Sequence, residues 1–210
     1  MGKDDVEFQK FYQNMISNAK EWHEANGWGS RRSQYRRYTA VYDALDIRRG
    51  DCVVDIGCGT GDLSQFLWEK GVDVCYHGFD IMPEMVDLAK QKHGEKFRLW
   101  DIYESALDVR SDWTIGIGTI GALATRDETE RWAKLTKMVQ NIASTSDKGF
   151  AFTMLTDRNP HNKADDHHWF VDTSEAIGKV IEMIPPSMLL TIKMDYHPHE
   201  VMFVVKNEGF

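Results

Sequence analysis

Short apolar runs alternate with segments of helical periodicity along most of this chain. The apolar runs cover residues 53–56, 72–79, 97–100, 113–117 and 150–155, with further runs at 188–194 and 201–206. Near-continuous apolar runs of this length are typical of strands buried on both faces of a parallel sheet. A polar segment at residues 195–200 joins the last two runs and predicts an antiparallel hairpin. The pattern therefore favours an α/β fold.

Helical periodicity occupies the segments between these runs. It predicts helices over residues 4–24, 33–45, 62–70, 84–93, 128–145 and 174–183. The clearest is 128–145, where Trp132, Leu135, Met138, Val139 and Ile142 share one helical face. Alternation of strands and helices predicts a doubly wound sheet with helices on both faces.

The composition fits one globular domain of 210 residues, with 42% hydrophobic and 28% charged residues. A net charge of −8 argues against nonspecific binding to nucleic acid or membranes, which both reward positive potential. No apolar run reaches the length of a membrane span, and residues 1–10 are too polar for a signal peptide. The three cysteines, Cys52, Cys58 and Cys75, form no CxxC pair, which predicts reduced thiols in a cytoplasmic protein.

The segment at residues 53–63 organises the rest of the prediction. An apolar run that contains Asp55 leads to three glycines at alternate positions, Gly57, Gly59 and Gly61, and an amphipathic segment follows. Glycines let the chain turn sharply and let bare backbone approach a ligand. A strand, a tight glycine turn and a helix in this order form a nucleotide cradle in doubly wound sheets.

Acidic residues at three successive strands strengthen this interpretation. Asp55 lies in the first run, Asp80 follows the second run and Asp101 follows the third. Asp80 stands about 20 residues beyond the last glycine, where an acid accepts hydrogen bonds from ribose hydroxyls. Since the carboxyl ends of parallel strands meet at one edge of a sheet, the three carboxylates are expected at the same rim.

Three motifs carry a resemblance to the class I S-adenosylmethionine-dependent methyltransferases. They are VDIGCGTG at residues 54–61, GFDIMPEM at 78–85 and WDI at 100–102. One residue separates the second and third glycines, as in that family, whereas the dinucleotide fingerprint has two. The resemblance covers about residues 35–155.

The resemblance implies a Rossmann-like core of seven mostly parallel strands with a reversed last strand, over residues 47–210 of a single domain spanning 1–210. It also implies S-adenosylmethionine as cofactor and S-adenosylhomocysteine as product. Gly57 and Gly59 would line the methionine moiety, Asp80 would hold the ribose, and Asp101 would meet the adenine amino group. The cofactor set expected within the motifs and strand ends is Asp55, Gly57, Cys58, Gly59, Asp80, Ile81, Met85, Asp101, Ile102 and Gly118.

Residues 1–46 form the N-terminal helical part, for which two interpretations stay open. Methyltransferases of this class often begin with helices that close over the cofactor, so the first helix is either such a lid or an ordinary packing helix. Six arginines gather in this part, and they suit a solvated helix face, a nucleic-acid patch or carboxylate binding: Arg31, Arg32, Arg36, Arg37, Arg48 and Arg49. Residues 27–37 resemble the entry segment of small-molecule methyltransferases, which adds Gln34 and Arg37 as cofactor neighbours.

The acceptor side shows no fixed catalytic motif. Residues 118–123 contain neither an Asn/Asp-Pro-Pro-Tyr/Phe run nor a Pro-Cys pair, and so do not resemble the nucleobase methyltransferases that carry these signatures. The polar loop at 157–172 offers His167 and His168 as candidate bases, and Trp28, His168 and Trp169 as candidate substrate contacts. No metal site is predicted, because the adjacent Asp165, Asp166, His167 and His168 lack a spaced second cluster.

The predicted function is methyl transfer from S-adenosylmethionine to a small-molecule acceptor, at oxygen or nitrogen and including a carboxylate. The minimal length and the acidic charge favour this class. Three alternatives stay open: an RNA methyltransferase, another group transfer such as aminopropyl transfer, and a non-catalytic S-adenosylmethionine-binding protein. The expected partner is a small molecule, with no membrane and no nucleic acid, and the chain is expected as a monomer or homodimer.

Overall fold

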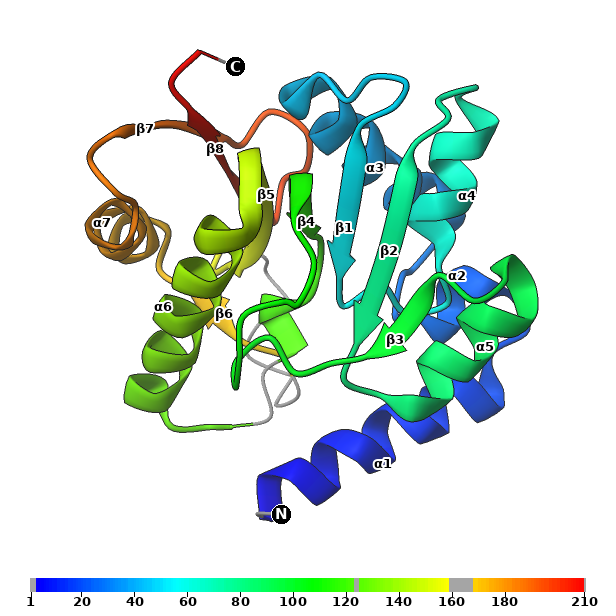
Figure 1. The fold of residues 1–210 in the computed structure, drawn as a ribbon. Helices are drawn as coiled ribbons and strands as arrows, with labels where there is room; N and C mark the ends of the chain where they lie inside the picture. The colour runs from blue at the N-terminus through cyan, green and yellow to red at the C-terminus, as the bar shows by residue number, and fades with distance from the viewer. Residues whose placement is uncertain (1–2, 123–124, 159–167, 210) are drawn as a thin grey trace.

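The computed structural model describes residues 3–122, 125–158 and 168–209, which are organised around one mixed sheet (Figure 1). The strand order is β3-β2-β1-β4-β5-β8-β7. Strands β1 to β5 pair in parallel, and β8 lies antiparallel between β5 and β7. The doubly wound, mostly parallel sheet with a reversed last strand is therefore confirmed. The strands on this path are β1 (Cys52–Ile56), β2 (Cys75–Asp80), β3 (Phe97–Leu99), β4 (Ser111–Gly116), β5 (Ser146–Thr156), β7 (Met188–Lys193) and β8 (Glu200–Asn207).

The sheet holds one strand more than the seven predicted. The additional strand β6 (Phe170–Val171) pairs in parallel with the end of β5, at Leu155 and Thr156. A strand of two residues is too short to leave a periodic signal in the sequence. Strand β5 also begins at Ser146 rather than at residue 150, because Ser146 pairs in parallel with Ser111 of β4.

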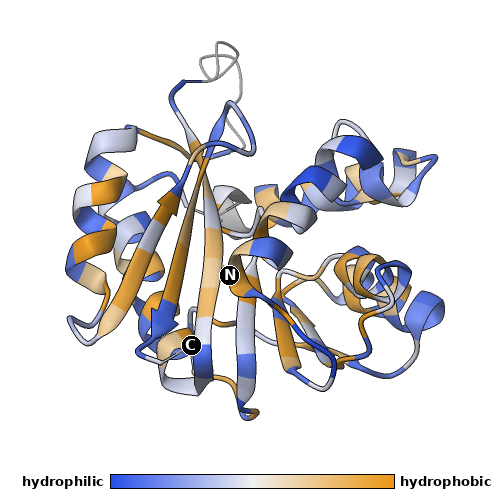
Figure 2. Cartoon of the chain, turned by 90° about the horizontal axis from the view of Figure 1, so that it is seen from above, coloured by the Kyte–Doolittle hydropathy of each residue, from blue (hydrophilic) through white to orange (hydrophobic). Residues whose placement is uncertain are grey.

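Helices cover both faces of the sheet. Helices α3 (Arg31–Leu45), α4 (Asp62–Glu69) and α5 (Pro83–His93) pack on one face, and α6 (Glu128–Thr145) and α7 (Thr173–Met183) pack on the other (Figure 1). Each helix buries an apolar stripe against the strands, and Figure 2 shows the central strands as the most hydrophobic part of the chain. A short 3₁₀-helix, η1 (Ile120–Ala122), follows β4.

The N-terminal segment forms two helices, and the prediction of one helix over residues 4–24 is wrong. Helix α1 (Lys3–Asn18) ends before α2 (Trp22–Ala25) begins. The Glu24 carboxylate accepts hydrogen bonds from the backbone amides of Lys20 at 2.7 Å and Glu21 at 3.2 Å. These bonds cap a new helix and interrupt the first one, since side-chain acceptors satisfy the free amides of a helix start.

Helix α1 lies along the carboxyl ends of the strands, at the bottom of Figure 1. It is held at both ends, because Gln13 Nε2 donates to Glu84 of α5 at 2.7 Å and Glu7 pairs with Arg126 at 3.2 Å. This is the position expected of a lid, although closure of α1 over a ligand stays a prediction.

None of the described helices combines the length and the apolar composition of a membrane span. The cytoplasmic location stays a prediction.

Candidate functional site

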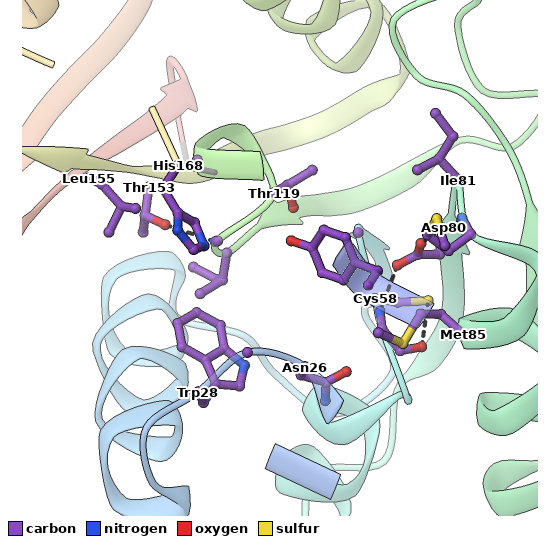
Figure 3. A pocket seen from close by; sticks show the side chains of 18 of the residues that line it. Asn26, Trp28, Cys58, Asp80, Ile81, Met85, Thr119, Thr153, Leu155 and His168 are labelled. Carbon is purple, nitrogen blue, oxygen red and sulfur yellow. Dashed lines mark hydrogen bonds between the residues drawn. The ribbon is translucent and has the colours of Figure 1, made fainter. Parts of the chain in front are cut away.

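A cavity of about 720 Å³ lies where the carboxyl ends of β1, β2 and β4 meet α1 (Figure 3). Helix α1 contributes Phe8, Gln9 and Tyr12 to its lining. The cavity brings together most of the site residues expected from the sequence, which are Trp28, Arg37, Asp55, Gly57, Cys58, Gly59, Asp80, Ile81, Met85, Asp101, Gly118 and His168.

The glycine turn presents bare backbone to this cavity. The φ angle of Gly57 is +66°, in the left-handed region that favours glycine, and a Cβ added there would lie 2.4 Å from the Thr119 hydroxyl. The amides of Gly57 and Cys58 donate to the Phe79 carbonyl at 2.7 and 3.0 Å. These bonds fix the turn to the end of β2, so that the backbone after β1 forms a rigid edge of the cavity.

Asp80 is held in place by the same turn. Its Oδ2 accepts from the Gly59 amide at 2.8 Å and its Oδ1 accepts from the Met82 amide at 2.9 Å (Figure 3). The residue is only 8% exposed, and burial raises the pKa of its carboxyl although both amides act in the opposite direction. A carboxylate offers about four lone-pair sites, so this oriented group can still accept hydrogen bonds from a ligand.

Asp55 and Asp101 complete an acidic wall. Asp55 is buried, and its Oδ2 accepts a hydrogen bond from the Tyr76 hydroxyl. Burial raises the pKa of Asp55 to about 7, and the neighbouring Asp80 and Asp62 act in the same direction. Asp101 Oδ1 accepts from the Tyr103 amide at 2.8 Å. Three carboxyl groups at one rim fit a ligand that carries an amine and hydroxyl groups.

The titration of Asp55 predicts a pH dependence of stability. Asp55 keeps its proton to about pH 7 in the folded chain, whereas an aspartate in an unfolded chain titrates near about 3.9. Between these values folding takes up a proton, so the free energy of unfolding falls as pH rises, by at most about 1.4 kcal/mol per unit. We expect Asp55→Asn to lose this slope, as measured by urea unfolding of both proteins at pH values from 4 to 8. Parallel stability curves for the two proteins would contradict the assignment.

Some residues expected at the site do not line the cavity. Gln34 is buried, and its Nε2 donates to Asp62 Oδ2 at 2.9 Å and to the Tyr38 hydroxyl at 3.1 Å, which anchors the start of α4 behind the glycine turn. Ile102 lies in the core beside α6. Trp169 is also a core residue, and its ring meets that of Trp132 edge to face at 4.7 Å. His167, Asp165 and Asp166 lie outside the described residues.

Arg37 lines the cavity, but its donors are already engaged. Its Nε donates to Glu200 Oε1 at 2.7 Å, its Nη1 donates to the Ser33 hydroxyl at 2.6 Å, and its Nη2 lies 3.2 Å from His197 Nε2. The guanidinium also lies 4.6 Å from the centre of the Trp28 ring. Arg37 therefore fixes one wall of the cavity, and it offers no free pair of donors for a ligand carboxylate.

Several lining residues had no signal in the sequence. Asn26 bonds twice to the glycine turn, since its Oδ1 accepts from the Thr60 amide at 2.9 Å and its Nδ2 donates to the Thr60 hydroxyl at 2.8 Å. Thr153 accepts from the Gly118 amide at 3.0 Å. Tyr12 did have a signal in the sequence. It shares a helical face with Phe8, and that face could have been predicted to lie over the rim of the sheet.

The cavity has two distinct ends. Figure 3 shows Cys58, Asp80 and Met85 on one side, and Trp28, Thr153, Leu155 and His168 on the other. The first side is acidic, and the second combines the rings of Trp28 and His168 with Leu155, Thr153 and the Arg37–Glu200 ion pair. In doubly wound sheets ligands bind at this edge, beyond the carboxyl ends of the strands.

Sequence comparisons agree with this arrangement. A family model described as "Methyltransferase domain" matches residues 53–141, from β1 into α6. A methyltransferase-named protein of Mycobacterium tuberculosis is 27% identical over 118 residues, which cover 56% of this chain and 71% of that protein. The malonyl-[acyl-carrier protein] O-methyltransferase of Acetivibrio thermocellus is 28% identical over 159 residues, covering 73% of this chain. The match spans 52% of the Acetivibrio protein, about half of its length.

A solved structure shares the fold over nearly its whole length. The N-methyltransferase NodS from Bradyrhizobium japonicum, in complex with S-adenosylhomocysteine, superposes with a TM-score of 0.67 at 14% identity and covers 96% of this chain and 98% of that one. The matched domain, the sheet order and the glycine turn beside Asp80 lead to the same conclusion. Residues 53–141 match a methyltransferase domain, and the chain has the class I methyltransferase fold, in which NodS holds S-adenosylhomocysteine.

Proposed function

We propose that this protein transfers the methyl group of S-adenosylmethionine to a small-molecule acceptor bound beside Trp28, Thr153 and His168. The observation that carries the proposal is the continuity of the cavity. One space reaches from Asp80 and Asp101, past the glycine turn, to the wall formed by Trp28 and His168. Such a cavity can hold two ligands in contact, and positioning the acceptor is the main contribution that a protein makes to methyl transfer.

The acidic end suits the cofactor. We assign Asp80 to the ribose hydroxyls, Asp101 to the adenine amino group, and Asp55 to the ammonium of the methionine moiety. The bonds from Gly59 and Met82 orient the Asp80 carboxylate before any ligand arrives, which reduces the entropic cost of binding. When bound, the cofactor supplies a methyl group activated by a sulfonium.

The other end suits a small acceptor. Trp28 lies against Gly118, where an added Cβ would be 2.8 Å from the indole ring, so the wall is closely packed. The His168 ring lies 5.9 Å from that of Phe11, which brings α1 over this end. His168 is placed to accept a proton from a hydroxyl acceptor, whereas a neutral amine or a carboxylate needs no base.

The comparisons support transfer to oxygen or nitrogen, since the Acetivibrio relative is named an O-methyltransferase and NodS an N-methyltransferase. The net charge of −8 also disfavours a polyanionic acceptor such as RNA. The test is turnover by the isolated chain. We expect S-adenosylhomocysteine to form when the cofactor is mixed with fractionated small metabolites, and not when it is mixed with total RNA. Methylation of RNA alone would overturn the proposal, and cofactor binding without turnover in any pool would favour a non-catalytic binding protein.

The variant His168→Ala tests whether the two ends of the cavity have separate roles, one in turnover and one in cofactor binding. For a hydroxyl acceptor we expect kcat to fall by about 10²- to 10⁴-fold, the usual contribution of a general base. Affinity for S-adenosylhomocysteine, measured by calorimetry, should stay within about twofold because His168 lies at the far end from Asp80. A loss of cofactor affinity equal to the loss of turnover would contradict this assignment.

A further inference from the structure

A second cluster of chemically active side chains lies at the opposite edge of the sheet. Parallel pairing places Cys52 at the start of β1 directly beside Cys75 at the start of β2. His77 follows two residues after Cys75, and side chains two apart on a strand share a face. The three residues therefore meet on one face of the sheet, although 23 positions separate the two cysteines in the sequence.

The distances are slightly shorter than those of a zinc ligand set. Cys52 Sγ lies 3.1 Å from Cys75 Sγ, and Cys75 Sγ lies 3.4 Å from His77 Nε2. One ligand atom from each residue lies within 4.8 Å of the other two, the only such three-residue group of His, Cys, Asp or Glu among the described residues. Zinc bonds of about 2.3 Å to sulfur and 2.0–2.1 Å to nitrogen give tetrahedral edges of roughly 3.5–3.8 Å. Small side-chain rotations would satisfy that geometry.

Part of the cluster is accessible to solvent. Cys75 is exposed, and Cys52 and His77 are half-buried. In Figure 1 the front of β1 and β2 faces the viewer, with no described helix before it. The neighbouring Arg98 does not compete for the site, because both of its terminal nitrogens bond to Asp108, at 3.0 and 2.6 Å.

We propose that Cys52, Cys75 and His77 bind one zinc ion with water in the fourth position. Two thiolates and an imidazole select a thiophilic ion such as zinc over magnesium or calcium, which prefer oxygen ligands. His77 also distinguishes this cluster from a disulfide, which would use the two sulfurs alone. Cys75 and His77 stand five and three positions before Asp80 on β2, so they lie about 16 and 10 Å from the cofactor end, at about 3.3 Å per residue. The ion joins β1 to β2 and takes no part in methyl transfer.

The test uses the full-length chain, freed of metal and kept reduced. Calorimetric titration with zinc should show one ion bound per chain, and cobalt should give the visible absorption of a tetrahedral site together with thiolate charge-transfer bands. Because zinc binds the folded chain in preference, it should also raise the Tm. Cys75→Ser and His77→Gln should each weaken zinc binding at least tenfold. Cys58→Ala, which removes the remaining cysteine, should leave zinc binding unchanged.

Two results would overturn the proposal. One is the absence of saturable zinc binding by the reduced chain. This result overturns the proposal even where protein purified in air carries a Cys52–Cys75 disulfide. The other is zinc binding by Cys75→Ser that equals wild type. S-adenosylhomocysteine affinity of Cys75→Ser should match wild type, so the zinc site and the methyltransferase assignment can fail independently.

Discussion

Replacing Arg37 by Met should lower the free energy of unfolding by about 3–5 kcal/mol, the usual cost of breaking a buried ion pair on one side. The Arg37 side chain is 6% exposed and that of its partner Glu200 is 2% exposed. Without the guanidinium, the Glu200 carboxylate would keep only the Tyr196 hydroxyl, at 3.2 Å, as a described side-chain partner. The loss of stability arises from the unpaired, buried Glu200 carboxylate. The attraction within the intact ion pair exceeds the cost of desolvating its two charges by only a small amount.

Urea unfolding of wild type and variants at neutral pH would measure this cost. The double variant Arg37→Met with Glu200→Leu should recover most of the loss, since an apolar pair of similar volume can replace a buried ion pair. Arg31→Met is the matched control, because Arg31 pairs with Glu69 at 2.8 Å on the surface, where such pairs contribute at most about 1 kcal/mol. A double variant as unstable as Arg37→Met would show that lost packing, and not the unpaired carboxylate, causes the destabilisation.

The sequence predicted the parts of the fold that depend on long periodic segments. Helix α6 matches its predicted bounds, and the parallel strands lie where apolar runs predicted them, because both signals repeat over many residues. The break between α1 and α2 escaped prediction because one side chain, Glu24, decides it. Strand β6 escaped because two residues carry no period.

Within the site, too, some residues could be predicted from the sequence and others could not. Asp80 and the glycine turn were predictable because local geometry joins them, through the end of β2 and the turn after β1. The bond between Arg37 and Glu200 joins residues 163 positions apart, and no local pattern indicates which partner an arginine will find. Cys52 and Cys75 meet through strand register alone, so a search for closely spaced cysteine pairs overlooks them. Residues joined by tertiary packing need a structure to be found.

Removing the Asp80 carboxylate should weaken cofactor binding more than any other single change at the acidic end. Hydrogen bonds to a charged group contribute about 1.5–3 kcal/mol, which corresponds to about 10- to 150-fold in affinity. The effect should reach the upper part of this range, because Asp80 is buried and the amides of Gly59 and Met82 aim its carboxylate. Asp80→Ala also leaves these two amides without their acceptor, which loosens the glycine turn itself.

Calorimetric titration of S-adenosylhomocysteine into wild type, Asp80→Ala and Asp80→Asn would separate these two contributions. The asparagine keeps one oxygen acceptor and loses the charge, so its affinity should lie between those of the other two proteins. Asp73→Ala is the matched control, because this exposed acid precedes β2 at the opposite edge of the sheet and should leave binding unchanged. Equal affinity of Asp80→Ala and wild type would remove Asp80 from the cofactor site. An affinity of Asp80→Asn as low as that of Asp80→Ala would instead show that the negative charge, rather than the fixed turn, provides the binding energy.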